Sequence, residues 1–182
     1  IVKTDAIDGI SHAGADFEIR ASGDIVRPDG SIAALDGETV ATVTTDETGE
    51  ARADNLPLGS GTARYEVVET QAPAGFLLDQ TTHIVDLTYA DQKTPVVEAR
   101  LNVSDDYTKV DISKVDASGE QEVEGAQLTL YGPDKTEIDS WTSSDKPHRV
   151  EHLAPGTYSL REMMSPRTYD LAEEITFEIK DT

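Results

Sequence analysis

The sequence predicts an all-β protein built from two consecutive β-sandwich domains. Short runs that alternate apolar and polar residues recur between clusters of Gly, Pro, Asp and Asn, as expected for strands joined by turns. A stretch that begins at Tyr65 recurs in weaker form from Tyr158, so the 182 residues divide between two related units. The fold class and the number of domains follow from these two observations.

The expected strands follow one another at intervals set by turn-forming residues. Pairs such as Asp8-Gly9 and Pro155-Gly156 favour tight turns and end the alternating runs. Residues 22–40 have no counterpart in the second half, and we expect a long loop there with one extra short strand. The expected strands are 1–4, 15–21, 40–45, 63–70, 83–89 and 95–104 in the first half, and 109–115, 126–131, 137–142, 148–152, 157–163 and 174–180 in the second.

Matched residues define the repeat and its boundary. Lys3 matches Lys114 with a shift of 111 residues (114 − 3), and Glu69 matches Glu162 with a shift of 93 (162 − 69). The shift falls because the first half carries the insertion. We therefore expect one domain over 1–107 and a second over 108–182.

The second domain is expected to lack its last strand in this chain. Val85 aligns with Ile175, a shift of 90 (175 − 85), and in the first domain a further strand, 95–105, follows that point. No segment of the second domain corresponds to that strand. Asp181 has the parity of an inward residue, but it aligns with Asp91, which begins a turn, so we do not favour it as a site residue.

Composition excludes several classes of partner. The net charge is −21, with 36 acidic residues against 15 basic ones, which argues against nucleic acid and anionic membrane surfaces as ligands. There is no cysteine, so covalent reinforcement would have to use other side chains. No apolar run approaches the roughly 18 residues of a membrane span. Because the chain begins at Ile1 and has no signal peptide, we expect an excised piece of a longer protein.

Strand parity directs two glutamates and two lysines into the predicted cores. Glu69 shares a strand face with Tyr65 and Val67, and Glu162 repeats this arrangement in the second half. Lys114 follows the apolar parity of its strand, and Lys3 does the same after Ile1. Inward lysine and glutamate are rare unless they pair, so each domain is expected to hold a buried Lys–Glu contact.

A third inward group appears in the last strand of the first domain. Asp105 continues the apolar face of Leu101 and Val103, whereas Asn102 lies on the opposite face. Lys3, Glu69 and Asp105 would then form a triad. Residue types alone leave two interpretations open: a buried salt bridge or a snorkelling lysine, or a covalent site in which a neutral amine attacks an Asp or Asn side chain with the glutamate as proton shuttle.

These residues carry a resemblance to a known family. The pattern Lys-x-Asp, then Gly-Ala, then Tyr-x-x-x-Glu-x-x-Ala-Pro-x-Gly-aromatic resembles the CnaB-like (collagen-adhesin B-type, prealbumin-like) domains of Gram-positive surface adhesins and pilins. The resemblance implies prealbumin-like (CnaB/Ig-like) sandwiches that form a Lys–Asn or Lys–Asp isopeptide bond by themselves, assisted by a buried acid. It assigns Lys3 as nucleophile, Glu69 as proton shuttle and Asp105 as acyl partner, with loss of water. Lys114 and Glu162 would be in place but uncrosslinked.

The expected function is therefore structural. The resemblance implies a self-crosslinking stalk module of an adhesin or pilus-like protein, without enzymatic turnover, outside the cell and anchored to the cell wall through parts not in this chain. Its partners would be neighbouring domains of the same surface protein. The alternatives are a module that binds a host ligand, either a matrix protein or a cell-surface carbohydrate, through 22–40, and a hydrolase with two facing acids.

No cofactor or metal is expected. The four histidines, His12, His83, His148 and His152, match no zinc spacing and are expected at the surface or in turns. Acidic pairs lack the alternating oxygen ligands of a calcium loop. Trp141 lies in an alternating strand and is expected in the core rather than on a sugar-binding surface.

Overall fold

The computed structural model describes residues 1–89, 91, 96–119, 121–167 and 169–180. Over these residues the chain forms fourteen strands and no helix, which confirms the all-β prediction. None of the described residues forms a helix long and apolar enough to cross a membrane. The chain divides into unit 1, Ile1–Pro73 with Leu77–Asp106, and unit 2, Ala74–Phe76 with Tyr107–Thr182.

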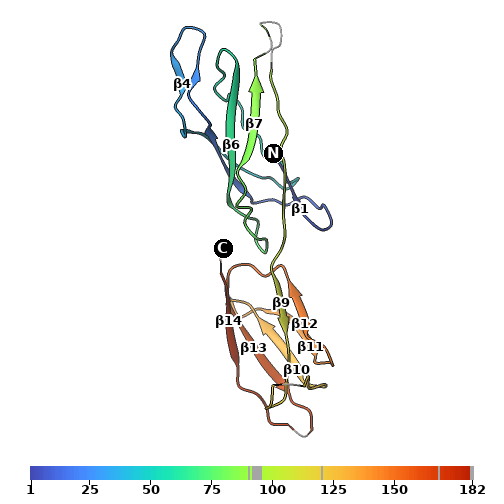
Figure 1. Ribbon diagram of the computed structural model, residues 1–182. Coiled ribbons are helices and arrows are strands. Elements are labelled where there is room, and N and C mark those ends of the chain that lie inside the picture. The colour runs from blue at the N-terminus through green and yellow to red at the C-terminus, as the bar shows by residue number, and fades with distance from the viewer. Residues whose placement is uncertain (90, 92–95, 120, 168, 181–182) are drawn as a thin grey trace. The chain divides into compact units, whose positions relative to one another are not determined.

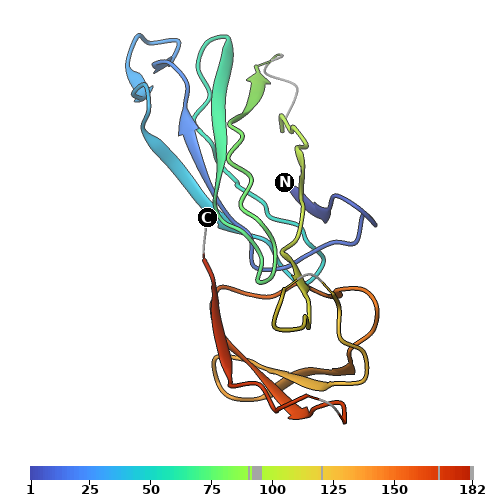
Figure 2. The same ribbon diagram turned by 60° about the horizontal axis from the view of Figure 1, so that its bottom comes forward.

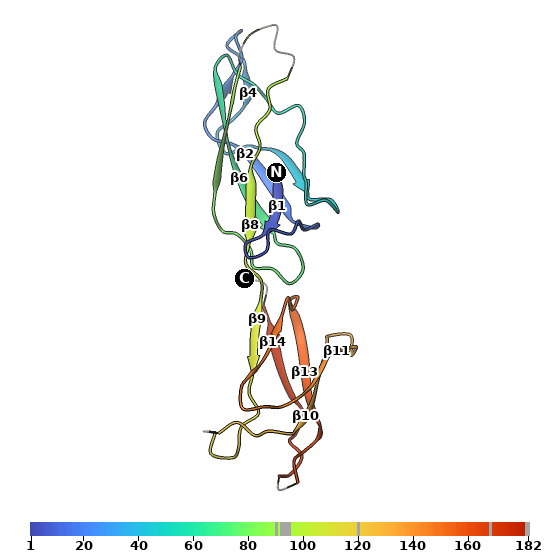
Figure 3. The same cartoon turned by 90° about the vertical axis from the view of Figure 1, so that its right-hand side faces the viewer.

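Unit 1 is organised around one antiparallel sheet. Its strands run in the order β5-β2-β6-β7, as Figure 2 shows, and a separate parallel pair joins the first strand, β1, to the last, β8 (Figure 3). The strands are β1 (Val2–Asp5), β2 (Asp16–Ala21), β3 (Ile25–Val26), β4 (Ile32–Ala34), β5 (Thr39–Thr44), β6 (Thr62–Gln71), β7 (His83–Thr88) and β8 (Asn102–Asp105).

Strand β6 shows how the sequence builds the core of unit 1. Its alternate residues Ala63, Tyr65 and Val67 are buried, and Glu69 is buried next in the same series. Burying each large apolar side chain contributes about 1.5–3 kcal/mol. Facing residues of β2 and β8 complete the core, so the glutamate lies at the end of a fully packed row. The other fully or nearly buried core residues are Ala15, Phe17, Ile19, Ala21, Ile25, Ala34, Leu87 and Val103.

Two expectations about unit 1 are wrong in detail. The 22–40 region holds two short strands, β3 and β4, which pair as a hairpin, rather than one. Ile25 and Ala34 of this hairpin are buried in the core, so the insertion is part of the domain's packing. The strand expected over 95–104 forms only at Asn102–Asp105, because its partner β1 is four residues long and offers no further backbone groups to pair with. Residue 95 lies outside the described residues.

Unit 2 repeats the four-stranded main sheet of unit 1 and has fewer strands outside it among the described residues. The sheet has the order β11-β10-β13-β14, and β9 pairs with β12 (Figure 1). Leu130, Val150, Leu153 and Tyr158 form its buried core, and Trp141, which was expected in the core, is partly buried and packs against them. The strands are β9 (Lys109–Ile112), β10 (Gln127–Tyr131), β11 (Glu137–Thr142), β12 (His148–Glu151), β13 (Gly156–Met164) and β14 (Ile175–Ile179).

Strand register corrects the alignment of the two units. Tyr65 pairs with Val85 in unit 1, and Tyr158 pairs with Phe177 in unit 2. Val85 therefore corresponds to Phe177, a shift of 92 (177 − 85), and not to Ile175. The expected shift of 90 was wrong by two residues, which preserves the inward and outward alternation and so could not be detected from it.

Candidate functional site

The structure brings Lys3, Glu69 and Asp105 together inside unit 1. The three residues are 1%, 3% and 3% exposed. The Lys3 Nζ atom lies 2.8 Å from Glu69 Oε1, and it also forms an ion pair with Asp105 Oδ1. The Phe17 ring lies beside the same ammonium, with its centroid 5.7 Å from Nζ. Three side chains from the first strand, a central strand and the last strand therefore meet in an apolar interior.

Backbone pairing explains why these three residues converge. Strands β1 and β8 lie side by side as a parallel pair (Figure 3). In their register Lys3 lies opposite Val103 and Asp5 lies opposite Asp105. Lys3 and Asp105 are thus diagonal neighbours on the same inward face. Glu69 reaches the site from β6, where its backbone pairs with Phe17 of β2 next to a β-bulge. A bulge changes the direction of the side chains beside it, and this one adjoins the Phe17–Glu69 pair.

The site holds one cation and two carboxyls in a desolvated interior. Burial raises the pKa of Glu69, although the nearby Lys3 ammonium and the Asp79 N–H oppose this. Burial likewise raises the pKa of Asp105 against the opposing effect of Lys3. With both carboxyls ionised the site would carry an excess negative charge away from water, which is costly. One carboxyl therefore tends to hold a proton.

Two carboxyl oxygens in the site have no hydrogen bond of acceptable geometry. Asp105 Oδ2 is fully buried without a hydrogen-bond partner, and so is Glu69 Oε1. The 2.8 Å contact between Glu69 Oε1 and Lys3 Nζ is an ion pair whose angles are poor for a hydrogen bond. Buried polar atoms without partners are rare and costly, and they concentrate at functional sites.

Sequence reasoning missed two residues beside the triad. The backbone N–H of Asp79 donates to Glu69 Oε2 at 2.8 Å. The Asp79 carboxylate in turn contacts His83 Nε2 at 2.7 Å. His83 was expected at the surface or in a turn, but it is the first residue of β7 and is partly buried. Its parity with Val85 could have identified it as an inward residue.

Asp5, the acid of the Lys-x-Asp pattern, stabilises the turn after β1 and is not part of the triad. It is 4% exposed, and its Oδ1 accepts the backbone N–H of Ile7 at 2.5 Å and that of Asp8 at 3.4 Å. An aspartate side chain that accepts backbone N–H groups two and three residues further along the chain stabilises a tight turn. Asp5 therefore holds the end of β1 in place two residues after the lysine.

Unit 2 contains two of the three corresponding groups. Lys114 Nζ lies 3.4 Å from Glu162 Oε2, and the lysine side chain is 16% exposed against 1% for the glutamate. The backbone N–H of Ala172 donates to Glu162 Oε2 at 2.6 Å, ten residues after the glutamate, as Asp79 does in unit 1. Asp181 lies outside the described residues. The Lys–Glu half of the site is therefore repeated.

The strand β1, which carries Lys3, and its counterpart β9, which ends at Ile112 two residues before Lys114, have different neighbours. In unit 1, β1 forms a parallel ladder with β8 and a bridge from Val2 to Glu50. In unit 2, β9 pairs with β12 in antiparallel orientation, and among the described residues it has no second ladder partner. The position that β8 occupies in unit 1, and with it Asp105, has no counterpart among the strands of unit 2 that the structure describes.

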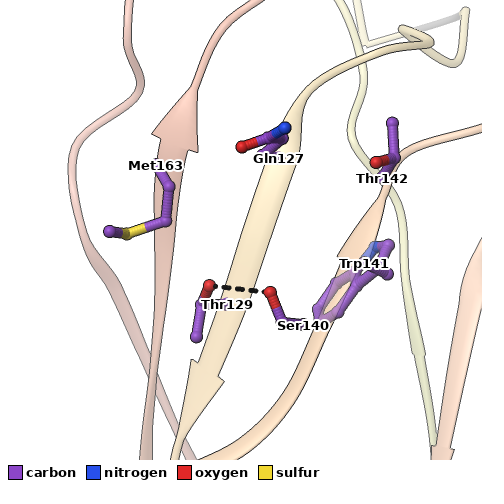
Figure 4. A pocket seen from close by; sticks show the side chains of 6 residues that line it. All are labelled: Gln127, Thr129, Ser140, Trp141, Thr142 and Met163. Carbon is purple, nitrogen blue, oxygen red and sulfur yellow. Dashed lines mark hydrogen bonds between the residues drawn. The ribbon is translucent and has the colours of Figure 1, made fainter.

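A surface pocket on unit 2 offers a different kind of site. It lies over β10, β11 and β13, where the Thr129 and Ser140 hydroxyls are 3.2 Å apart (Figure 4). None of its six lining residues carries a carboxylate, so it does not supply the two facing acids that a hydrolase would need. The described residues contain no group of three or more His, Asp or Glu placed to hold a metal ion. The pocket is lined by Gln127, Thr129, Ser140, Trp141, Thr142 and Met163.

The chain consists of two tandem prealbumin-like domains, each with a lysine in contact with a buried glutamate. The sequence model of the SpaA prealbumin-like fold domain family matches residues 1–101 and 108–182. The chain belongs to this family, and the resemblance found in the sequence is confirmed. No curated protein sequence matches the chain.

Solved structures share the fold. The Bacillus anthracis TIE protein is 24% identical with a TM-score of 0.54, and the match covers 99% of this chain and 30% of the TIE chain. A C-terminal fragment of the pilus adhesin SpaC from Lactobacillus rhamnosus GG is 16% identical with a TM-score of 0.54, covering 99% of this chain and 81% of the fragment. The chain thus spans less than a third of the TIE protein.

Proposed function

We propose that the chain is a structural stalk module of a Gram-positive surface adhesin or pilus-like protein, stabilised by an isopeptide bond between Lys3 and Asp105. The single observation that carries the proposal is the buried contact of the Lys3 amine with both Glu69 and Asp105. Family membership and the pilus adhesin fragment of similar fold support the setting. In that setting the module lies outside the cell, anchored to the wall through other parts of the protein, with neighbouring domains as its partners.

Bond formation begins with a proton rearrangement within the triad. Burial disfavours charge on every member, so the Lys3 ammonium gives a proton to the carboxylate that remains ionised. This leaves a neutral amine between two protonated carboxyls, a state with no net charge to desolvate. The raised pKa values of Glu69 and Asp105 support this distribution of protons.

The covalent step joins nitrogen to carbon and releases water. The Lys3 Nζ lone pair attacks Asp105 Cγ to form the new N–C bond. The protonated Glu69 donates its proton to the departing hydroxyl of Asp105, whose C–O bond breaks, and it takes up a proton from the nitrogen. The products are an amide and one water, and Glu69 ends in the protonation state in which it began. Its role is that of a general acid and base.

Fixed geometry replaces a catalytic cofactor in this reaction. Groups held in van der Waals contact react with effective molarities that lower the barrier by about 7–11 kcal/mol. The Lys3 nitrogen already touches the Asp105 carboxyl in the folded domain. The reaction therefore follows folding and occurs once in unit 1 of each chain, so the module has chemistry without turnover.

The bond would change how unit 1 bears tension. β1 and β8 are parallel, so a pull at Ile1 and at the end of β8 loads their hydrogen bonds in shear. A link from Lys3 to Asp105 would carry that load directly and bypass residues 4–104. Such a bypass suits a module placed in series within a stalk.

Pulling single molecules tests the mechanical role. When the two ends of the chain are stretched, the wild-type chain should show no unfolding extension from unit 1. The Glu69→Gln chain should show one of about 350 Å, from roughly 100 released residues at about 3.5 Å each. An extension of that length in the wild-type chain would sink the proposal.

A second candidate function is binding of a host matrix or cell-surface ligand through the 22–40 insertion. The observation that favours it is the exposure of Val26, Ile32 and Leu35 on this hairpin, at 40%, 51% and 54%. Exposed apolar side chains gathered on one segment are typical of interaction sites. Immobilised matrix proteins tested against the wild-type chain and an Ile32→Ser variant would decide: equal binding, or none, removes this candidate.

A further inference from the structure

The segment between β6 and β7 connects two parts of the proposed reaction site. Its residue Leu77 donates a backbone hydrogen bond to the carbonyl of Asp106 at 2.8 Å, directly after the acyl residue Asp105. Two residues later, the backbone N–H of Asp79 donates to Glu69 Oε2 at 2.8 Å. One short stretch of backbone is therefore fastened both to the end of the acyl strand and to the proposed proton shuttle.

The Asp79 side chain fixes this stretch to the sheet. Its Oδ1 accepts the backbone N–H of Thr81 at 2.9 Å, which closes a tight turn. Its Oδ2 lies 2.7 Å from His83 Nε2. His83 is anchored in turn, because it opens β7 and its backbone pairs with Val67, two residues before Glu69. The side chains of Asp79 and His83 are only 17% and 22% exposed, so solvent competes little for this contact.

We propose that Asp79 and His83 form a clamp that positions Glu69 for proton transfer between Lys3 and Asp105. The inference rests on the isopeptide function proposed above and assigns it two further positioning residues. Neither side chain touches the reacting atoms. They act through the Asp79 N–H, which occupies Glu69 Oε2 and leaves Oε1 directed at the Lys3 nitrogen.

The hydrogen bond to Glu69 Oε2 determines which oxygen of this carboxyl can transfer a proton. A carboxyl has two oxygens, and an N–H donor held against one of them places the exchangeable proton on the other. Here the other oxygen is Oε1, which is 2.8 Å from Lys3 Nζ and has no aligned hydrogen bond. A mobile 79–83 segment would let the Glu69 carboxyl rotate and would lower the fraction of time it spends in the reactive orientation.

The charge of Asp79 also favours the reactive protonation state. Although burial acts in the opposite direction, hydrogen bonds from Thr81 and His83 lower the pKa of Asp79, so its carboxylate stays ionised. Burial raises the pKa of Asp105, and the Asp79 negative charge raises it further. The Asp79 carboxylate thus helps to keep Asp105 protonated, the form in which its hydroxyl can leave as water.

Unit 2 provides an internal comparison. Its Glu162 receives the same backbone hydrogen bond, from Ala172 at 2.6 Å. Ala172 has no carboxylate, and the residue that corresponds to His83 by register is Ile175, since Leu160 pairs with Ile175 as Val67 pairs with His83. The backbone contact is common to both units, whereas the clamp is present in the unit that contains the complete triad.

The test follows bond formation in newly made protein. The full chain is synthesised in a cell-free reaction, synthesis is stopped, and samples are quenched in denaturant at intervals for intact-mass measurement. Asp79→Ala and His83→Ala should slow the loss of water by about tenfold each, the effect of losing the orientation set by one hydrogen bond. Asp79→Asn and His83→Gln keep hydrogen-bonding groups and should restore part of the rate.

A matched control separates positioning from general damage to β7. Asp86→Ala removes an exposed carboxylate on the same strand, one that pairs with Arg64 at 2.8 Å, and should leave the rate unchanged. Protease resistance of unit 1, measured in the same samples, should show the clamp variants folded while still unlinked. If Asp79→Ala and His83→Ala lose water at the wild-type rate, the clamp is refuted. It is also refuted if the decrease in rate equals the fraction of unfolded protein measured by protease resistance. A wild-type chain that never loses water would overturn the isopeptide function and the clamp together.

Discussion

The change Glu69→Gln tests the energetic consequence of the proposed bond while leaving the shape of the site intact. Glutamine fills the same volume and keeps an oxygen for the Asp79 N–H, but it cannot shuttle a proton. Lys3 and Asp105 would remain an ion pair without joining. The variant chain should therefore have the full mass of its residues, whereas the wild-type chain should be lighter by one water.

The size of the effect follows from the loop that the bond closes. Lys3 and Asp105 are 102 residues apart in the chain. By the loop-entropy relation used for disulfides, closing a loop of this length stabilises the folded state by about 4.7 kcal/mol. A domain of about 100 residues loses about 4–8 °C of melting temperature per kcal/mol, so unit 1 of the variant should melt about 20–40 °C lower.

Calorimetry with intact-mass measurement on the same samples gives the answer. Glu162→Gln is the matched control, because it makes the same change at a buried glutamate beside Lys114. That control should lose one water from the sum of its residues, as the wild-type chain does, and should keep the wild-type melting of unit 1. The reasoning about loop entropy is wrong if Glu69→Gln is unlinked and yet melts with the wild type. The role given to Glu69 is wrong if the variant still loses water.

Three further outcomes follow from the same structure. Lys114→Ala should leave the wild-type mass loss unchanged in intact-mass spectra, and a water restored by this change would show that unit 2 is linked. Gly49→Ala should destabilise unit 1 by about 1–3 kcal/mol in urea unfolding. Gly49 has a φ of +74°, and a Cβ there would lie 2.7 Å from Ser11 Cβ and 2.8 Å from the Lys3 carbonyl oxygen. An unchanged free energy of unfolding would refute this account. In the linked domain Glu69 stays buried, so carbon NMR should find its pKa above the ordinary glutamate value of 4.5. Because the native state then binds more protons than the unfolded state, this group stabilises the domain most below 4.5, and its contribution falls as pH rises through the native pKa. A pKa at or below 4.5 would contradict the burial argument.

Alternation along strands made much of the site predictable. A side chain's face is fixed by whether its number is odd or even relative to its neighbours, so the buried positions of Lys3, Glu69 and Asp105 follow from short stretches of sequence. Asn102, expected on the outer face, is exposed. The roles of the triad in bond formation are a separate matter and remain a prediction.

Other features leave no trace in an alternating pattern. The strands β3 and β4 have two and three residues, too few for alternation to show. The register of β14 differs from the expected alignment by two residues, and an even shift keeps every residue on its face. The contact of Asp79 with Glu69 uses a backbone N–H, which every residue except proline carries, so residue type cannot reveal it.

The measurement that tests the central claim most directly is the mass of the intact, denatured chain, followed by sequencing of its proteolytic peptides. The account predicts a loss of one water from the sum of the residues, located in a branched peptide that joins Lys3 to Asp105. A chain of full mass, or a loss of water located between any other pair of residues, would contradict it.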